Sequence, residues 1–294
     1  MICTPFQSRR LVRRLIELQV FSSVRKEIER SARRVRKSTE TILLISPPSL
    51  NGVLSSAPIE ASLIDARIPY RRRLSEDKGE PFHIRIVDVV GTKAGPESNL
   101  MGLEIYPITV EGLRGKAGDP KRGTLSTVAQ AHALAQEISP TSTRIRRMRP
   151  WTLSGNWIDQ ALDTTYDPVF TALRDFLTEE GSIRVVPVTE VDSPETSNYD
   201  WIDVGLIQTI SEEWESFDLS QKEDAMGSLV EQALSRKMPS TARLEELLWH
   251  CVLGTNWKSD LASQVTKASK MWESKESKKA ASELIDSLIS QGII

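Results

Sequence analysis

Few side chains in this sequence could carry out chemistry. Asp88 follows an apolar run and Asp159 lies in a helical pattern. Together, two such carboxylates could bind a divalent cation or act as general acid and base. Taken singly, Asp88 is typical of an acid at a strand end and Asp159 of a solvated helix face. Their pairing therefore depends on the fold.

The other reactive residue types lack a useful spacing. His83, His132 and His250 lie far apart, and no two of them are four residues apart on a helix, as metal ligands often are. Cys3 and Cys251 have no partner cysteine nearby, so we expect reduced thiols. The sequence contains no phosphate-binding Gly-x-x-x-x-Gly-Lys, no dinucleotide Gly-x-Gly-x-x-Gly and no Gly-x-Ser-x-Gly elbow. Nucleotide-driven and esterase chemistry are thus unsupported.

Two groups of arginines could bind nucleic acid. One is Arg71, Arg72 and Arg73; the other is Arg144, Arg146, Arg147 and Arg149. Arginines can bind phosphate groups, but base stacking also requires aromatic neighbours, and only Tyr70 and Trp151 adjoin these groups. The alternative is loop charge balanced by acidic neighbours. Both interpretations remain open.

Charge is distributed unevenly along the chain. Its 294 residues carry a net charge of -2, but residues 1–150 hold 26 Lys and Arg against 15 Asp and Glu, and residues 151–294 hold 12 against 25. The basic half could bind DNA and the acidic half could bind basic proteins. The alternative is that both halves present solvated faces, and the charge distribution does not decide between the two interpretations. No apolar run spans a bilayer and no signal peptide is evident, so we expect an intracellular, cytoplasmic protein without membrane contact.

Apolar periodicity predicts an α/β fold with a parallel sheet flanked by helices, because strands and helices alternate. The predicted strands are 41–45, 82–90, 103–109 and 183–189. The predicted helices are 9–37, 52–66 (interrupted by Pro58), 124–138, 151–162 and 168–179, and a polar loop is expected at 192–198. We divide the chain into an amphipathic helical segment at 1–40, an α/β domain at 41–200 and a mainly helical, acidic region at 201–294.

One segment resembles the first motif of the DHH phosphoesterases, the RecJ superfamily. Residues 42–57 read ILLISPPSLNGVLSSA, where a strand, a turn glycine and small helical residues match the family pattern His-x-Asp-x-Asp-Gly. In that register Pro47 stands at the histidine, Ser49 at the first aspartate and Asn51 at the second. Asp88 matches the second motif. Residues 103–111, where the Asp-His-His signature belongs, contain neither aspartate nor histidine. Residues 123–131 resemble the helix that follows the signature, and residues 153–159, which end at Asp159, resemble the fourth motif.

This resemblance implies a two-metal phosphodiesterase fold whose ligand set is depleted. Two metal ions need several anionic or imidazole ligands, and a proline, a serine and an amide replace three of them. We therefore expect no metal, no other cofactor and no catalysis. The resemblance is to the replication-factor branch, which comprises cell-division-cycle protein forty-five and its archaeal RecJ-like counterparts. It implies a scaffold that associates with GINS and the MCM helicase and is therefore nucleoid-associated. A phosphoesterase with a rearranged site, or a standalone nucleic-acid-binding module, remains an alternative.

The last apolar pattern lies near the C-terminus. Ala281, Leu284, Ile285, Leu288 and Ile289 form one stripe of a helix at 277–290, which ends at Gly292. That stripe must be buried, either within this chain or in the groove of a partner.

Overall fold

A computed structural model of the chain describes residues 13–75, 82–88, 97–98, 102–159, 161–163, 165–234 and 240–294. Its main sheet has the strand order β2-β1-β3-β5-β4. The strands are β1 (Ile42–Ser46), β2 (Tyr70–Leu74), β3 (His83–Ile86), β4 (Glu97–Ser98) and β5 (Gly102–Ile105). Every neighbouring pair is parallel except β4 with β5. Because all five residues of β1 are buried, its uninterrupted apolar sequence fits a central strand. The predicted α/β class is confirmed.

Helices flank this sheet and also build the rest of the chain. In the first half they are α1 (Arg25–Lys37), α2 (Leu50–Asp65), α3 (Thr127–Ile138) and α4 (Thr143–Met148). The later helices are α5 (Ser154–Ile158), α6 (Pro168–Glu179), α7 (Val204–Glu213), α8 (Leu219–Leu234), α9 (Thr241–Leu248), α10 (Leu261–Glu273) and α11 (Ser277–Gln291). The strongest helix packing is between α2 and α3, and α11 also lies against α2. Pro58 is accommodated inside α2.

The N-terminal helix is shorter than the sequence predicted. Residues 9–12 lie outside the described part, and the chain then forms two 3₁₀ turns, Leu15–Glu17 and Gln19–Phe21, before α1 starts at Arg25. Tertiary contacts hold these turns, since the Leu15 amide donates to Gln136 Oε1 at 2.9 Å. Apolar residues spaced three or four apart are buried equally well by tight turns, which is why periodicity alone was misleading here.

A hairpin interrupts the region predicted as one strand and one helix. The predicted strand 103–109 divides at Tyr106-Pro107 into β5 and β6 (Ile108–Arg114). β6 pairs antiparallel with β7 (Pro120–Leu125), so the predicted helix 124–138 starts only at Thr127. The Ser126 side chain caps α3 by accepting from the Ala129 amide.

Three other boundaries differ from the sequence predictions. The strand predicted at 82–90 is β3, and residues 89–90 lie outside the described part. The helix predicted at 151–162 is a 3₁₀ turn (Arg149–Leu153) followed by α5, which ends at Ile158. The predicted strand 183–189 ends at Val186, just before Pro187, because proline has no amide hydrogen to donate to a neighbouring strand. Short 3₁₀ turns follow at Val188–Glu190 and Thr196–Tyr199, and a further turn spans Trp214–Ser216. The second of these turns overlaps the end of the expected loop 192–198 and extends one residue beyond it.

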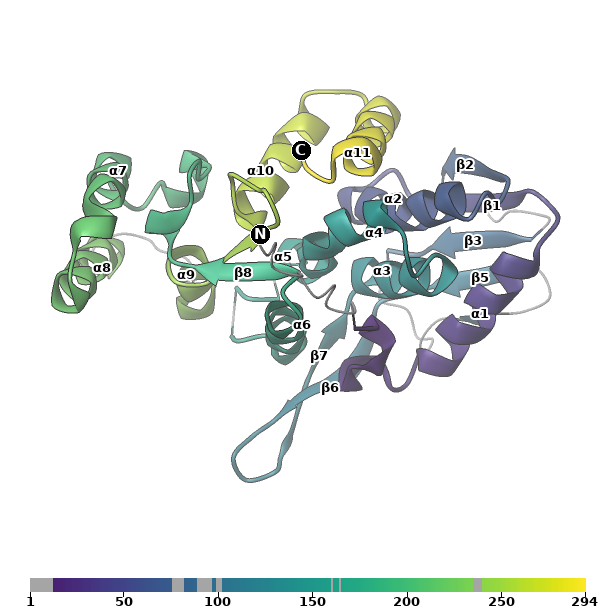
Figure 1. Ribbon diagram of the computed structural model, residues 1–294, viewed down its shortest axis with the longest axis horizontal. Coiled ribbons are helices and arrows are strands. Elements are labelled where there is room, and N and C mark those ends of the chain that lie inside the picture. Colours follow the sequence, from purple (N-terminus) through teal and green to yellow (C-terminus); the bar gives the residue numbers. More distant parts are fainter. Residues whose placement is uncertain are drawn as a thin grey trace, which may run out of the picture.

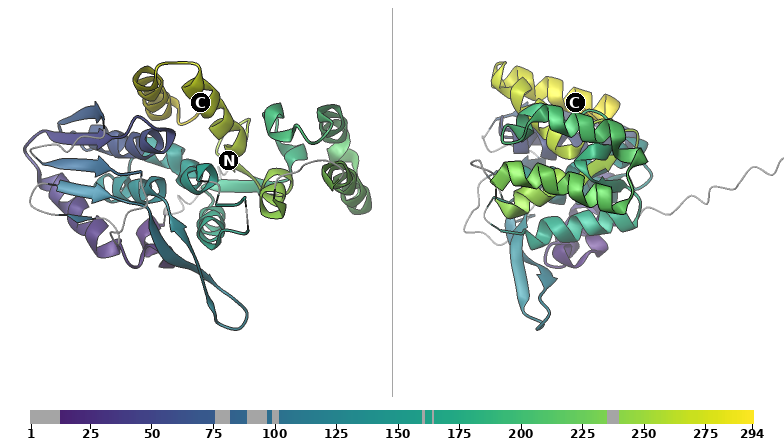
Figure 2. Two further views of the ribbon diagram at one scale, coloured as in Figure 1. Left: turned by 180° about the vertical axis from the view of Figure 1, so that it is seen from behind. Right: turned by 90° about the vertical axis from the view of Figure 1, so that its left-hand side faces the viewer.

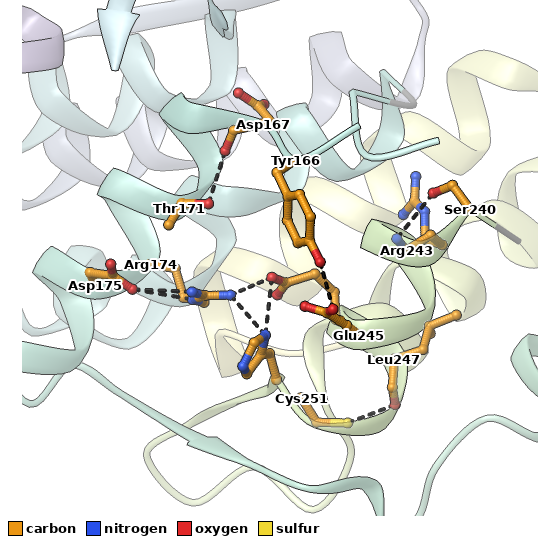
Figure 3. A network of polar contacts seen from close by, with 12 residues as sticks. Tyr166, Asp167, Thr171, Arg174, Asp175, Ser240, Arg243, Glu245, Leu247 and Cys251 are labelled. Carbon is orange, nitrogen blue, oxygen red and sulfur yellow. Dashed lines mark hydrogen bonds and ion pairs between the residues drawn. The ribbon is translucent and has the colours of Figure 1, made fainter. Parts of the chain in front are cut away.

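A second, small sheet joins sequence-distant segments. β8 (Ile183–Val186) pairs antiparallel with β9 (Cys251–Gly254). Figure 3 shows the neighbouring polar junction, where Arg174 of α6 contacts Glu246 and His250, and the Tyr166 hydroxyl donates to Glu245 at 2.5 Å. These contacts cross the proposed boundary at residue 200. The division of the chain into domains remains a prediction.

The molecule is elongated (Figure 1). The parallel sheet and its helices occupy one end, α7 and α8 occupy the other, and the β6–β7 hairpin extends from the middle as an arm. The reverse and end-on views in Figure 2 show α10 and α11 along one side. Among the described residues, no helix combines the length and apolarity needed to cross a bilayer.

Candidate functional site

The turn from β1 to α2 positions the first pair of site residues. β1 ends at Ser46, and the Ser49 side chain caps α2 by accepting from the Gly52 amide at 3.0 Å. A side chain at position 52 would come within 2.3 Å of the Pro47 carbonyl oxygen. Only glycine fits that close approach, which explains the glycine in the motif. Pro47 itself contributes no side-chain donor or acceptor.

Four residues predicted from the motifs come together at the carboxyl edge of the parallel sheet. The Ser49 hydroxyl donates to Asp88 Oδ2 at 2.8 Å. The Asn51 amide donates to Asp159 Oδ1 at 2.6 Å, across 108 positions of sequence. The serine and the asparagine that the motif resemblance places at metal-ligand positions therefore contact the two aspartates that it also places there. Such convergence of sequence-distant polar residues marks this edge as the candidate site.

The local environment raises the pKa of both aspartates. For Asp88 the main cause is loss of hydration, which hydrogen bonding by Ser49 and Asn51 partly offsets. Asp159 is exposed at the edge of the site, yet partial loss of hydration still raises its pKa, and the nearby charge of Asp88 adds to this effect. Asn51 is 7% exposed, and its Oδ1 has no hydrogen-bond partner within the described residues.

These side chains do not fit the pair of metal ions that the resemblance implies. A two-metal centre requires several charged oxygen or imidazole ligands around both ions. Here two carboxylates are present, and each already accepts a hydrogen bond from a neutral side chain. Across the described ranges, no three His, Cys, Asp or Glu residues are grouped as metal ligands.

The segment at the expected Asp-His-His signature has a structural role. Glu104 of β5 forms an ion pair with Arg85 of β3 at 2.9 Å and accepts a short hydrogen bond from Tyr106. The Gln130 side chain of α3 donates to the Tyr106 carbonyl at 2.6 Å. These polar side chains connect the strand, the turn and the helix.

The later motif segments fix the position of Asp159. At Gly155 a side chain would come within 2.5 Å of Ser126 Oγ, so glycine permits close packing of α5 on the start of α3. The buried Asn156 donates to the Thr124 carbonyl at 2.7 Å and to Asp167 at 2.6 Å. α5 ends two residues later, directly before Asp159.

The first arginine group lies on a strand, which corrects the loop interpretation. Arg71, Arg72 and Arg73 belong to β2, so alternate side chains point to opposite faces of the sheet. Arg71 and Arg73 are exposed, whereas Arg72 pairs with Glu60 of α2 and with Asp286 of α11 at 2.8 Å. Nucleic-acid binding by this group remains a prediction.

The second arginine group is divided between the surface and the interior. Arg146 and Arg147 are exposed on α4, and Arg144 pairs with Asp65. Arg149 is fully buried and pairs with Glu180, so of the two interpretations of this arginine only the pairing with an acidic neighbour applies. Phosphate binding by the other three remains a prediction.

The histidines and the described cysteine lie outside this site. His132 is buried in α3, and neither ring nitrogen has a hydrogen-bond partner within the described residues. Loss of hydration, assisted by the charge of Arg149, lowers the pKa of His132 to about 3. Cys251 is a buried free thiol, and Cys3 lies outside the described residues.

Sequence reasoning missed a basic surface on α1. The helix was recognised as amphipathic, but the charge of its exposed face was not considered. Seven Lys and Arg against two Glu in residues 25–37 are the signal that could have revealed it.

No family model matches this chain, and no curated protein matches it either. Among solved structures, the chain is similar to the crystal structure of CDC45 from Entamoeba histolytica. The TM-score is 0.49 and the sequences are 10% identical. The similarity covers 92% of this chain and 68% of that one.

Proposed function

We propose that this chain is a catalytically inactive, DHH-like scaffold subunit of a DNA replication assembly. The observation that carries the proposal is the convergence of Ser49 with Asp88 and of Asn51 with Asp159. The motif resemblance places these four residues at ligand positions, and they meet at one edge of the sheet. Two of the four are neutral groups that donate hydrogen bonds to the carboxylates.

Loss of catalysis is tested by metal binding and by hydrolysis. Isothermal calorimetry with Mn²⁺ should show no stoichiometric binding at micromolar ion. The wild-type chain should not cleave a single-stranded oligonucleotide with Mn²⁺ or Mg²⁺ any faster than the Asp88→Ala variant does. An isotherm abolished by Asp159→Asn, or cleavage abolished by Asp88→Ala, would contradict inactivity and favour the alternative, a phosphoesterase with a rearranged site.

The scaffold role also needs a surface for partners, for which the α7–α8 lobe (residues 203–234) is suited. A hollow of about 480 Å³ at its base is lined by four acids, Glu190, Asp192, Glu212 and Glu215, together with Arg184. An adjoining groove of about 270 Å³ is lined by apolar side chains that include Val191, Val204 and Ile207. This combination suits a partner segment with both basic and apolar side chains.

The resemblance implies GINS and the MCM helicase as partners, and we assign the lobe to GINS. Purified chain and purified GINS from the same organism should co-elute on size exclusion. The Glu212→Lys/Glu215→Lys variant should bind GINS at least tenfold more weakly, because it reverses two charges in the hollow. The control variant Glu273→Lys/Glu276→Lys makes the same charge change at exposed positions elsewhere and should bind normally. Absence of any complex with GINS or MCM would refute the assembly.

A further inference from the structure

We propose that α1 and the adjoining amino edge of the parallel sheet form a binding site for single-stranded nucleic acid. The site comprises Arg33, Arg34, Lys37, Ser38, Thr39 and Phe82, which line a hollow of about 530 Å³ together with Glu40. The neighbouring exposed Arg36 of α1 extends its positive charge. The inference does not rest on the scaffold role, and its test needs no partner protein.

The position of the hollow separates it from the site at Asp88 and Asp159. Residues 37–40 are separated from β1 by one residue, and Phe82 directly precedes β3. The Phe82 carbonyl accepts from the Leu43 amide at 3.2 Å, which fixes this corner to the sheet. Because β1 and β3 are parallel, their starts lie at one edge and the aspartate site lies at the other.

The exposed face of α1 carries unusually dense positive charge. The helix has a net charge of +5 over 13 residues, while Ile28, Ala32 and Val35 are buried against the core. Arg33, Arg36 and Lys37 are exposed, and their side chains form no hydrogen bond or ion pair with the residues that the structure describes. Elsewhere in the basic half, Arg72 and Arg144 are already paired with carboxylates.

The chemistry of the hollow favours a nucleic acid over other polyanions. Arginine presents a planar fork of donors that suits phosphate oxygens, and the Ser38 and Thr39 hydroxyls add further donors. A membrane surface is disfavoured because the apolar stripe of α1 is buried in its own core and cannot insert.

Arg34 and Phe82 add a feature that an acidic peptide would not use. The Arg34 guanidinium carbon lies 4.1 Å above the centre of the Phe82 ring, and the Arg34 side chain is exposed. Unpaired bases stack on guanidinium planes as well as on aromatic rings. A nucleotide whose base stacks on the Arg34 guanidinium, with the flanking phosphates near Arg33 and Lys37, would use both the planar stacking surface and the positive charge.

The site is tested with the full chain and a fluorescein-labelled 20-mer of thymidylate, by anisotropy over a salt series. The Arg33→Ala/Arg36→Ala/Lys37→Ala variant should bind at least tenfold more weakly at 0.1 M salt. Its log–log salt slope should fall by about 2, because each lost phosphate contact removes about 0.7 on single strands. The charge-matched control Lys116→Ala/Lys121→Ala/Arg122→Ala, at exposed positions of the β6–β7 hairpin, should stay within about twofold of the wild type.

Base stacking is tested by comparing the thymidylate 20-mer with an abasic 20-mer. The wild type should prefer the thymidylate strand several-fold, and Arg34→Lys, which keeps the charge but loses the plane, should abolish that preference. Unchanged melting temperatures would confirm that these exposed substitutions leave the fold intact.

Several outcomes would overturn the proposal. They are no binding of the thymidylate strand by the wild type, equal losses in the α1 and control variants, and no preference over the abasic strand. Competition by polyglutamate as effective as that by thymidylate would show that the surface recognises charge alone and fits an acidic protein instead. Equal binding to vesicles containing phosphatidylserine would point to a membrane.

Discussion

At the scale of single residues, His132 shows how burial controls a proton. Its imidazole is fully buried without a hydrogen-bond partner in the described structure, so the neutral form is strongly favoured. A histidine whose pKa is lower in the folded state stabilises the fold above its unfolded pKa of about 6.5, and that contribution is lost as the pH falls towards 3.

We therefore expect His132→Leu to reduce the acid sensitivity of the fold. In the wild type this residue should lower the unfolding free energy by up to about 1.4 kcal/mol per pH unit within that window. The variant should lose that slope, measured by urea unfolding at pH 7, 5.5 and 4. His250→Gln, a change at a partly exposed histidine, should keep the wild-type slope. Parallel pH profiles for the wild type and His132→Leu would contradict this account.

The aspartate pair should show the opposite dependence on pH. The pKa of Asp88 and that of Asp159 are raised above their ordinary value of 3.8, so the stabilising effect of the protonated forms is present below that pH and is lost as the pH rises through the folded pKa. The Asp88→Asn/Asp159→Asn variant keeps one acceptor oxygen at each position and removes both negative charges, so it should be more stable than the wild type at pH 7.

That gain in stability should shrink as the pH approaches 4. Chemical denaturation at the two pH values measures it, and the exposed Asp224→Asn serves as the matched control. Destabilisation at pH 7 would show that the charged forms are needed by the fold.

At the scale of elements, α11 is part of the core of this chain. Ala281, Leu284, Ile285 and Leu288 are buried, and α11 packs on α2. Polar contacts strengthen this packing: Asp286 pairs with Arg72, and the Gly292 carbonyl accepts from Trp151 Nε1 at 3.0 Å. The sequence alone did not decide whether the apolar stripe of this helix is buried within the chain or against a partner. In the structure it is buried within the chain.

Substitutions in α11 should therefore lower stability. We expect Leu284→Ala to cost about 2–5 kcal/mol of unfolding free energy, as is usual for a buried leucine. The control Ser290→Ala, at an exposed position of the same helix, should change the unfolding free energy little. Deletion of residues 277–294 should lower the melting temperature strongly. An unchanged melt after the deletion would contradict intramolecular packing.

Local patterns predicted some elements well and others poorly. β1 and α6 agree with the sequence because a continuous apolar run and an Asp-Pro helix start are local signals, with Asp167 capping α6. The β6–β7 hairpin was missed because its outer half is polar and exposed, so no apolar alternation continues along it. The resemblance placed Asn51 and Asp159 at motif positions, but their contact was not predicted, since no local pattern links residues 108 positions apart.

At the scale of the whole molecule, the charge asymmetry of the sequence becomes spatial. α1 lies towards the end that holds the parallel sheet, and the acidic α7–α8 lobe forms the opposite end (Figure 1). Residues 203–224 carry seven Asp and Glu against one Lys. The two proposed surfaces are therefore far enough apart to be altered independently.

Removal of the lobe should separate the two surfaces. A variant in which about eight Gly and Ser residues replace residues 203–239 should still melt cooperatively, because the β8–β9 pairing and the contacts of α6 with α9 remain. It should bind the thymidylate strand like the wild type and fail to co-elute with GINS. Loss of thymidylate binding in a variant that is still folded would show that the surfaces are not independent.

The packing of α11 on α2 also constrains how the chain reaches its native state. α2 is complete at residue 65, yet the helix that covers it starts at residue 277, so more than 200 residues are synthesised before contact is possible. Contacts between such distant segments form slowly and leave apolar surface uncovered in the meantime. A chain whose synthesis stops within α11 would therefore have a largely assembled sheet and an uncovered apolar surface on α2. Chaperones and proteases recognise such exposed apolar surface.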